Sequence, residues 1–191
     1  MTNALLTDLY QLTMMAAYAK NDMSDDEATF DMFIRKLPED WGYYIAAGIE
    51  DAIDEIVNLE FDESDIAYLR EQEMFEESFL EELADFKFDG EVYAVKEGEV
   101  VFPNEPLLRI TGKRSQVQLL ETLVLNTINY QTMIASKASR VVEAADGKGV
   151  ADFGLRRAQG EDAAMKGARA AYIAGCIGTS NVKAGKEYGI P

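Results

Sequence analysis

Two consecutive strand-to-helix patterns constrain the fold of this 191-residue chain more than any other feature. A predicted strand at 149–153, which begins with a short apolar run at 149–151, leads through a turn into an alanine-rich helical pattern at 162–175. A second short strand at 176–178 and a second helix at 181–188 repeat that order. Such βα units build parallel sheets, which are normally covered by helices on both faces. The sequence therefore predicts an α/β fold.

The two βα units are too few to close a barrel. A full (β/α)₈ barrel takes roughly 200–250 residues, and only the last part of this chain shows the repeat. An open parallel edge invites pairing with another strand. We therefore expect an incomplete barrel, completed by further chain or by a partner.

The turn Asp152–Gly160 is the strongest candidate for a ligand site. It combines an acid, an aromatic side chain, two glycines and two adjacent arginines. Ligands of parallel α/β proteins bind at the carboxyl ends of the strands. Each guanidinium offers a planar fork of donors to a carboxylate or phosphate, so Arg156 and Arg157 indicate an anion. The alternative is a tight βα turn whose arginines are only solvated.

The residues before this repeat mix helical and strand patterns. Apolar residues at helical spacing predict helices at 5–19, 43–57, 64–70, 78–86, 116–128 and 132–145. An alternating stretch predicts a strand at 28–34, and short apolar runs between turn residues predict a β-rich element at 88–112. We expect an α+β domain at 1–112 and, at 113–191, a helical connection that leads into the barrel.

Composition excludes several classes of function. The net charge is −17, with 27 acids and 6 bases in residues 1–100, against 8 acids and 12 bases in residues 101–191. The acidic half argues against nucleic-acid binding, and the basic half favours a small anionic ligand. There is no histidine, which excludes a Ser-His-Asp triad and histidine metal ligands among these residues.

Cysteine content and hydropathy suggest where the protein works. Cys176 is the only cysteine, so no disulfide framework is expected. The first residues show no signal-peptide pattern, and no apolar run approaches the ~20 residues that span a bilayer. We expect a cytoplasmic protein with no membrane partner.

Five blocks of sequence resemble, in order, the nicotinate phosphoribosyltransferases. They are Leu6–Met14, Leu37–Asp40 with Gly42-Tyr43, Val100–Pro106, Asp152–Arg157 and Gly178–Gly185. The resemblance runs from about Leu5 to Pro191. It implies an α+β domain joined to an irregular α/β barrel. It also implies transfer of a phosphoribosyl group from 5-phosphoribosyl 1-pyrophosphate to nicotinate, giving nicotinate mononucleotide, with ATP coupling, Mg²⁺ and a homodimer with shared active sites.

The resemblance assigns roles to the residues of the turn. Phe153 would stack on the pyridine ring of nicotinate, and Tyr10 of the neighbouring subunit would cover the other ring face. Arg156 would bind the carboxylate or a nearby phosphate, and Arg157 is a further phosphate-binding candidate. The alternative for Tyr10 is a half-buried helix tyrosine without a ligand.

Gly178–Gly185 would supply the other end of the substrate pocket. Ser180 and Asn181 stand where the nicotinamide-using relatives carry an acid, which would repel a carboxylate. Their neutral side chains should favour the acid form of the substrate. Thr179 would add donors at the start of the helix. Ser180 is alternatively, or in addition, the N-cap of that helix.

Three basic residues elsewhere are candidates for phosphate binding. Arg35 would reach the 5-phosphate of a neighbouring subunit's ligand. Lys137 and Arg140 are three residues apart, so they share a helix face and could line the pyrophosphate. Surface charge is the alternative for these two.

The chain departs from the family at its end. In the family, the ATP-coupled step uses a phosphorylated histidine in a segment that would follow Pro191. We therefore expect a truncated amino-terminal portion that is inactive alone. The alternatives are a non-catalytic pyridine-binding or assembly module completed by a second chain, and a nicotinamide- or quinolinate-using phosphoribosyltransferase.

Overall fold

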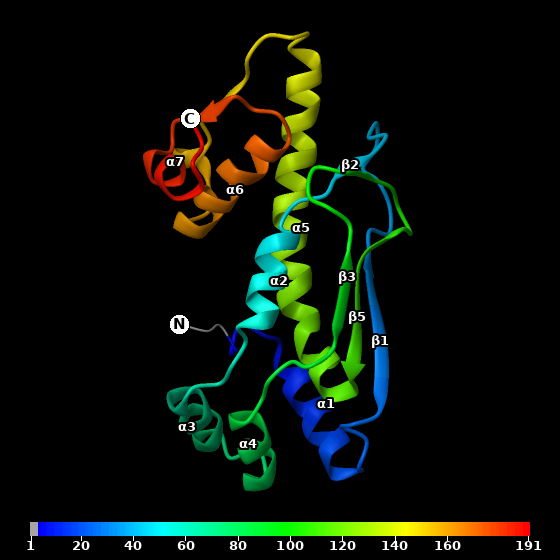
Figure 1. Cartoon of the computed structure of the whole chain (residues 1–191). Coiled ribbons are helices and arrows are strands. Elements are labelled where there is room, and N and C mark those ends of the chain that lie inside the picture. The colour runs from blue at the N-terminus through cyan, green and yellow to red at the C-terminus, as the bar shows by residue number, and fades with distance from the viewer. Residues whose placement is uncertain (1–3) are drawn as a thin grey trace. The chain divides into compact units, whose positions relative to one another are not determined.

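The structure, a computed structural model, describes residues 4–191 and mixes helices with strands, as predicted (Figure 1). No closed barrel is present in this range. The elements are α1 (Leu9–Lys20), β1 (Glu27–Phe33), β2 (Tyr44–Ile45), α2 (Ile49–Val57), α3 (Glu63–Glu71), α4 (Glu77–Ala84), β3 (Glu91–Ala94), β4 (Val100–Val101), β5 (Pro106–Lys113), α5 (Arg114–Ala144), β6 (Ala151–Asp152), the 3₁₀ turn η1 (Leu155–Arg157), α6 (Glu161–Ile173), β7 (Gly178–Thr179) and α7 (Val182–Tyr188).

The described chain separates into two compact units whose segments interleave in the sequence. The first contains residues up to 32, 51–93 and 108–126, and the second contains residues 33–50, 94–107 and 127–191. The predicted domain boundary after residue 112 stays a prediction. No helix in residues 4–191 is long and apolar enough to cross a membrane.

In the first unit, strand β5 lies between β1 and β3. Strand β1 alternates as predicted, with Ala28, Phe30 and Met32 partly buried and the residues between them exposed. The exposed Asp31 receives two hydrogen bonds from Arg109 of β5, at 2.6 and 2.7 Å. The pattern is that of a sheet with one packed face and one solvated face.

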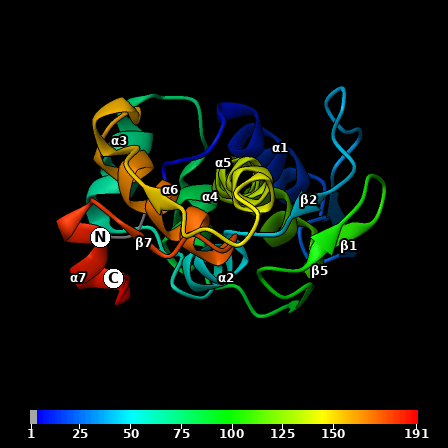
Figure 2. The same cartoon turned by 90° about the horizontal axis from the view of Figure 1, so that it is seen from above.

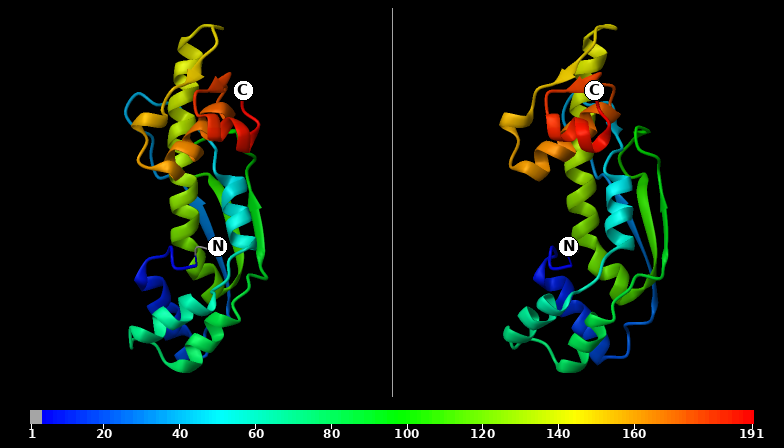
Figure 3. Two further views of the ribbon diagram at one scale, coloured as in Figure 1. Left: turned by 90° about the vertical axis from the view of Figure 1, so that its left-hand side faces the viewer. Right: turned by 60° about the vertical axis from the view of Figure 1, so that its left-hand side comes forward.

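In the second unit, two pairs of short strands form. Strands β2 and β4 are antiparallel, with Tyr44 opposite Val101. Strands β6 and β7 are parallel, with Asp152 opposite Thr179, so the predicted βα units are confirmed. Helices α6 and α7, which follow these strands, lie against each other (Figure 3).

The helix predicted at 43–57 is wrong in its first half. Residues 44 and 45 form β2, and α2 begins only at Ile49. The interruption is Gly48, whose φ of +85° is a left-handed conformation that favours glycine. The apolar spacing of Ile45 and Ile49 arises because both are buried, not because both lie on one helix.

The two helices predicted at 116–128 and 132–145 are a single helix, α5, of 31 residues. Figure 2 looks almost along its axis. The intervening Asn129–Gln131 contains neither proline nor glycine, so nothing in the sequence breaks the helix. The polar residues of this stretch suggested a loop between two helices. Gln131 and Thr132 are instead buried within the continuous helix.

Candidate functional site

The candidate site is the loop between β6 and α6, at the carboxyl end of the parallel strand pair. Asp152, the last residue of β6, organises this loop. One carboxylate oxygen accepts the Gly154 backbone N–H at 2.9 Å, and the other accepts the Thr179 hydroxyl at 2.8 Å. One side chain therefore holds both the start of the loop and the end of the neighbouring strand.

Backbone bonds continue this connection between the strands. The Ser180 N–H donates to the Asp152 carbonyl at 2.8 Å, and the Asn181 N–H donates to the Thr179 hydroxyl at 3.1 Å. The segment 179–181 is thereby placed beside the loop. The two sequence blocks predicted to form one pocket do lie next to each other.

The ring and anion candidates of the loop face solvent. Phe153 is 59% exposed, and Arg156 and Arg157 of η1 are also exposed. Single exposed apolar side chains are common on protein surfaces, so the exposure of Phe153 alone does not indicate a ligand. The loop has an aromatic side chain and two guanidinium groups exposed to solvent.

The alternative role of Ser180, as the N-cap of the helix that follows β7, is wrong. Asn181, not Ser180, is the N-cap of α7, and its side-chain oxygen accepts the Ala184 N–H at 3.2 Å. The Asn181 amide nitrogen also donates to the Ala164 carbonyl at 3.3 Å, and the residue is buried. Ser180 is exposed. The correct signal was in the sequence, because asparagine caps at least as well as serine.

Beside the loop lies an open hollow of about 320 Å³. Its walls include Arg157 and Asp152 from the loop, Tyr130 from α5, and small residues of α6. Tyr130 donates its hydroxyl to the Ala163 carbonyl at 2.8 Å. Burial raises the pKa of Tyr130 above its ordinary value, and Asp162 and Asp152 raise it further. The sequence reasoning did not single out Tyr130.

The two basic candidates on α5 differ in their surroundings. Lys137 is exposed. The Arg140 guanidinium stacks 3.9 Å from the centre of the Trp41 ring and 4.7 Å from that of Tyr43, and it donates to the Tyr43 carbonyl at 2.7 Å. Arg140 is thus already engaged in the structure, although its phosphate-binding role stays a prediction.

The remaining candidates lie outside the loop. Arg35 is exposed and follows β1, and it belongs to the second unit, as the loop does. Tyr10 is 46% exposed on α1 and belongs to the first unit. Their predicted roles involve a neighbouring subunit and stay predictions.

The described residues hold no group of three or more acidic, histidine or cysteine side chains that could bind a metal ion. The expected Mg²⁺ ion stays a prediction. Mg²⁺ in phosphate chemistry is usually bound by one or two carboxylates together with the substrate's own phosphates.

Comparison with known proteins shows the family of the chain. Residues 5–129 match the model of the nicotinate phosphoribosyltransferase (NAPRTase) N-terminal domain. The chain belongs to the nicotinate phosphoribosyltransferase family. It is 50% identical to nicotinate phosphoribosyltransferase pncB2 of Mycobacterium tuberculosis over 98% of its own length, and 45% identical to the nicotinate phosphoribosyltransferase of Bacillus subtilis.

Solved structures share the fold of this family member. The human nicotinic acid phosphoribosyltransferase matches 97% of the chain with a TM-score of 0.89 and 33% identity. A nicotinate-nucleotide pyrophosphorylase from Pyrococcus furiosus matches with a TM-score of 0.77 and 24% identity, which shows likeness of fold alone. The chain spans 40% of the Mycobacterium relative and 38% of the Bacillus relative and of the human structure.

Proposed function

We propose that this chain forms the nicotinate-binding part of an enzyme that transfers a phosphoribosyl group from 5-phosphoribosyl 1-pyrophosphate to nicotinate. The products would be nicotinate mononucleotide, a precursor of NAD, and pyrophosphate. The observation that carries the proposal is the exposed Phe153–Arg156 loop at the carboxyl end of the β6–β7 pair. Membership of the family supports it.

The chain's own residues would bind and orient nicotinate. Phe153 offers a flat face for the pyridine ring, and Arg156 offers a fork for the carboxylate. Ser180 is exposed beside the loop, and its neutral side chain adds no charge that would repel the carboxylate of nicotinate. Holding the ring nitrogen in line with C1 of the ribose would be this region's contribution to the rate.

The finer features of the reaction rest on the resemblance. ATP coupling, Mg²⁺ and a homodimer in which Tyr10 serves the neighbouring site are parts of the proposal. The 191 residues contain no histidine, so a phosphorylated histidine is not among them. Arg35, Lys137, Arg140 and Arg157 are the proposed contacts for the phosphates.

Ligand binding tests the proposal. Titration of the chain with nicotinate by calorimetry should show binding, which Phe153→Ala weakens about 3- to 10-fold through lost ring stacking. Arg156→Ala should weaken nicotinate about 10-fold or more, but change nicotinamide, which lacks the negative charge, much less. Lys148→Ala, another exposed cation in the second unit, is the matched control.

Two results would contradict the proposal. Tighter binding of nicotinamide or quinolinate than of nicotinate would favour the corresponding phosphoribosyltransferase instead. Equal losses for Arg156→Ala and Lys148→Ala would mean that the loop contributes only general positive charge.

A further inference from the structure

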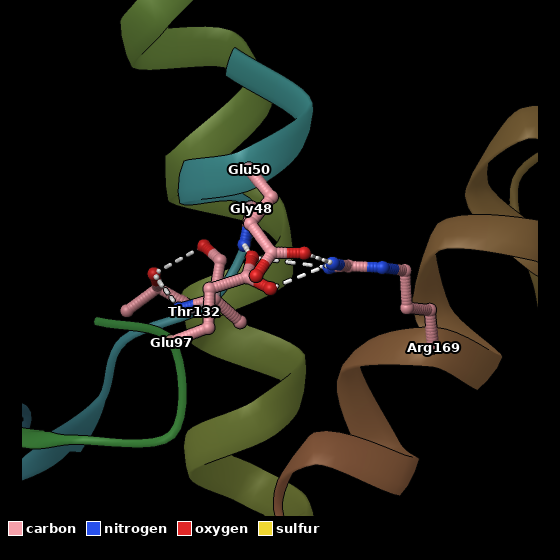
Figure 4. Close-up of polar contacts among 6 residues, drawn as sticks. Gly48, Glu50, Glu97, Thr132 and Arg169 are labelled. Atoms are coloured by element: carbon pink, nitrogen blue, oxygen red, sulfur yellow. Dashed lines mark hydrogen bonds and ion pairs between the residues drawn. The ribbon is translucent and has the colours of Figure 1, made fainter. Parts of the chain in front are cut away.

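A buried ion pair joins α6 to the segment between β3 and β4 (Figure 4). The side chains of Arg169 and Glu97 are only 14% and 8% exposed. Arg169 donates to the two carboxylate oxygens of Glu97 at 3.0 and 2.6 Å, and also to Glu50 at 2.9 Å. A bidentate interaction of this kind fixes the orientation of the two side chains as well as the distance between them.

Glu97 is itself held in place by the backbone. Its carboxylate accepts the Gly48 N–H at 2.6 Å, directly before the first residue of α2. The first N–H groups of a helix lack partners within the helix and carry partial positive charge, so a carboxylate is favourable there. Glu97 thus satisfies a helix start and the Arg169 guanidinium at once.

The turn that carries Gly48 has little freedom to move. An added Cβ at Gly48 would come within 2.8 Å of the Thr127 carbonyl oxygen of α5. The Thr132 hydroxyl accepts the Ala47 N–H at 3.2 Å and donates to the Ala47 carbonyl at 3.0 Å. Glu97 is therefore tied to a fixed point on α5.

Arg169 connects Glu97 to the helix that follows the candidate site. It lies on α6, and α6 begins at Glu161, directly after the loop that carries Phe153 and Arg156. Near the start of α6, the Ala163 carbonyl also accepts a hydrogen bond from the Tyr130 hydroxyl. A helix moves as a stiff rod, so loss of the bonds at Arg169 would let α6 and the attached loop shift together.

We propose that Arg169, through Glu97, is a positioning residue for the nicotinate site. The bidentate bond between Arg169 and Glu97 fixes the position of α6. The position of α6 in turn fixes the geometry of Phe153 and Arg156 in the attached loop. This inference rests on the proposed function. A buried ion pair is weak evidence for stability, since apolar residues often pack at least as favourably, but it selects one arrangement of the elements that it joins.

The test uses the full chain and four variants. Arg169→Lys keeps the positive charge but loses the bidentate guanidinium geometry. Arg169→Met removes the positive charge, and Glu97→Gln removes the buried negative charge. Glu50→Gln is the matched control, because it alters the exposed partner of the same guanidinium, whose side chain is 74% exposed. Three quantities are measured: nicotinate affinity, amide hydrogen exchange in residues 153–160, and the thermal unfolding midpoint.

At a temperature where every variant is folded, Arg169→Lys and Glu97→Gln should weaken nicotinate binding by about 10-fold. They should also speed amide exchange in the loop relative to the amides of α5. Glu50→Gln should leave both quantities within about twofold of the unaltered chain. Arg169→Met should exceed Arg169→Lys in both effects. A purely structural role would lower the unfolding midpoint and leave the affinity of the folded chain unchanged.

The outcomes separate this inference from the proposed function. If the unaltered chain fails to bind nicotinate, the proposed function fails, and loop exchange in the variants still decides whether Arg169 positions the loop. If the chain binds but affinity or loop exchange is unchanged in Arg169→Lys and Glu97→Gln, the positioning role is overturned. If Arg169→Met does not fold, the two milder variants give the result.

Discussion

At the scale of single residues, the candidate site depends on one carboxylate. Asp152 accepts hydrogen bonds from the Gly154 N–H and the Thr179 hydroxyl, so it links the loop after β6 to the end of β7. An aspartate two residues before a glycine is a common way to shape a turn. The effect of Asp152 on substrate binding would be indirect. It would act through the position of Phe153, which lies between Asp152 and Gly154 in the chain.

Removal of the Thr179 hydroxyl tests this link. Thr179→Val keeps the shape of the side chain but leaves an oxygen of Asp152 without its partner, so the free energy of unfolding should fall by about 1 kcal/mol. Urea unfolding followed by circular dichroism measures the change. Thr179→Ser keeps the hydroxyl and should recover most of the loss. Equal losses for Val and Ser would show that the hydroxyl bond contributes nothing.

At the scale of the elements, Gly48 decides where α2 begins. Its left-handed backbone ends the β2 segment, and its N–H is held by Glu97. The absence of a side chain also lets the turn approach the Thr127 carbonyl of α5. The left-handed backbone and the close approach to α5 each require glycine independently. A second glycine with a similar φ but no close neighbour can separate the two effects.

Gly48→Ala should lower the free energy of unfolding by about 2–4 kcal/mol, because backbone strain adds to a steric clash. Gly147 has a similar φ of +80°, but no heavy atom lies within 4 Å of its added Cβ. Gly147→Ala should therefore cost only the backbone strain, about 1 kcal/mol. Chemical unfolding of both variants measures the difference. Similar losses at the two sites would rule out the clash.

At the scale of the whole molecule, the charge is strongly acidic and unevenly distributed along the sequence. The net charge is −17, and residues 101–191 alone carry more bases than acids. Repulsion among the acidic side chains opposes folding, and dissolved salt weakens it. The basic segment contains the candidate anion site.

Salt should therefore stabilise the chain. Raising sodium chloride from about 0.02 M to about 0.5 M should raise the thermal unfolding midpoint by about 2–5 °C, because the Debye length falls well below 10 Å. Scanning calorimetry measures the shift. Choline chloride should give a similar rise, which would separate screening from binding of sodium. A lower midpoint at high salt would mean that attractive ion pairs outweigh the repulsion.

The sequence by itself determined the mixed α and β character, the two βα units and the position of the candidate loop. These features are local, because periodicity and turn residues act over a few neighbouring positions. The ordered blocks, from Leu6–Met14 to Gly178–Gly185, also indicated the family.

Only the tertiary structure decided which contacts hold these parts in place. The close approach of Gly48 to α5 and the buried pair of Glu97 with Arg169 depend on residues far apart in sequence. Glu97 was one of many acids in an acidic half, and nothing local marked it as buried. Burial and pairing of charges are set by the packing of distant elements, because the chain must offset desolvation with a specific partner.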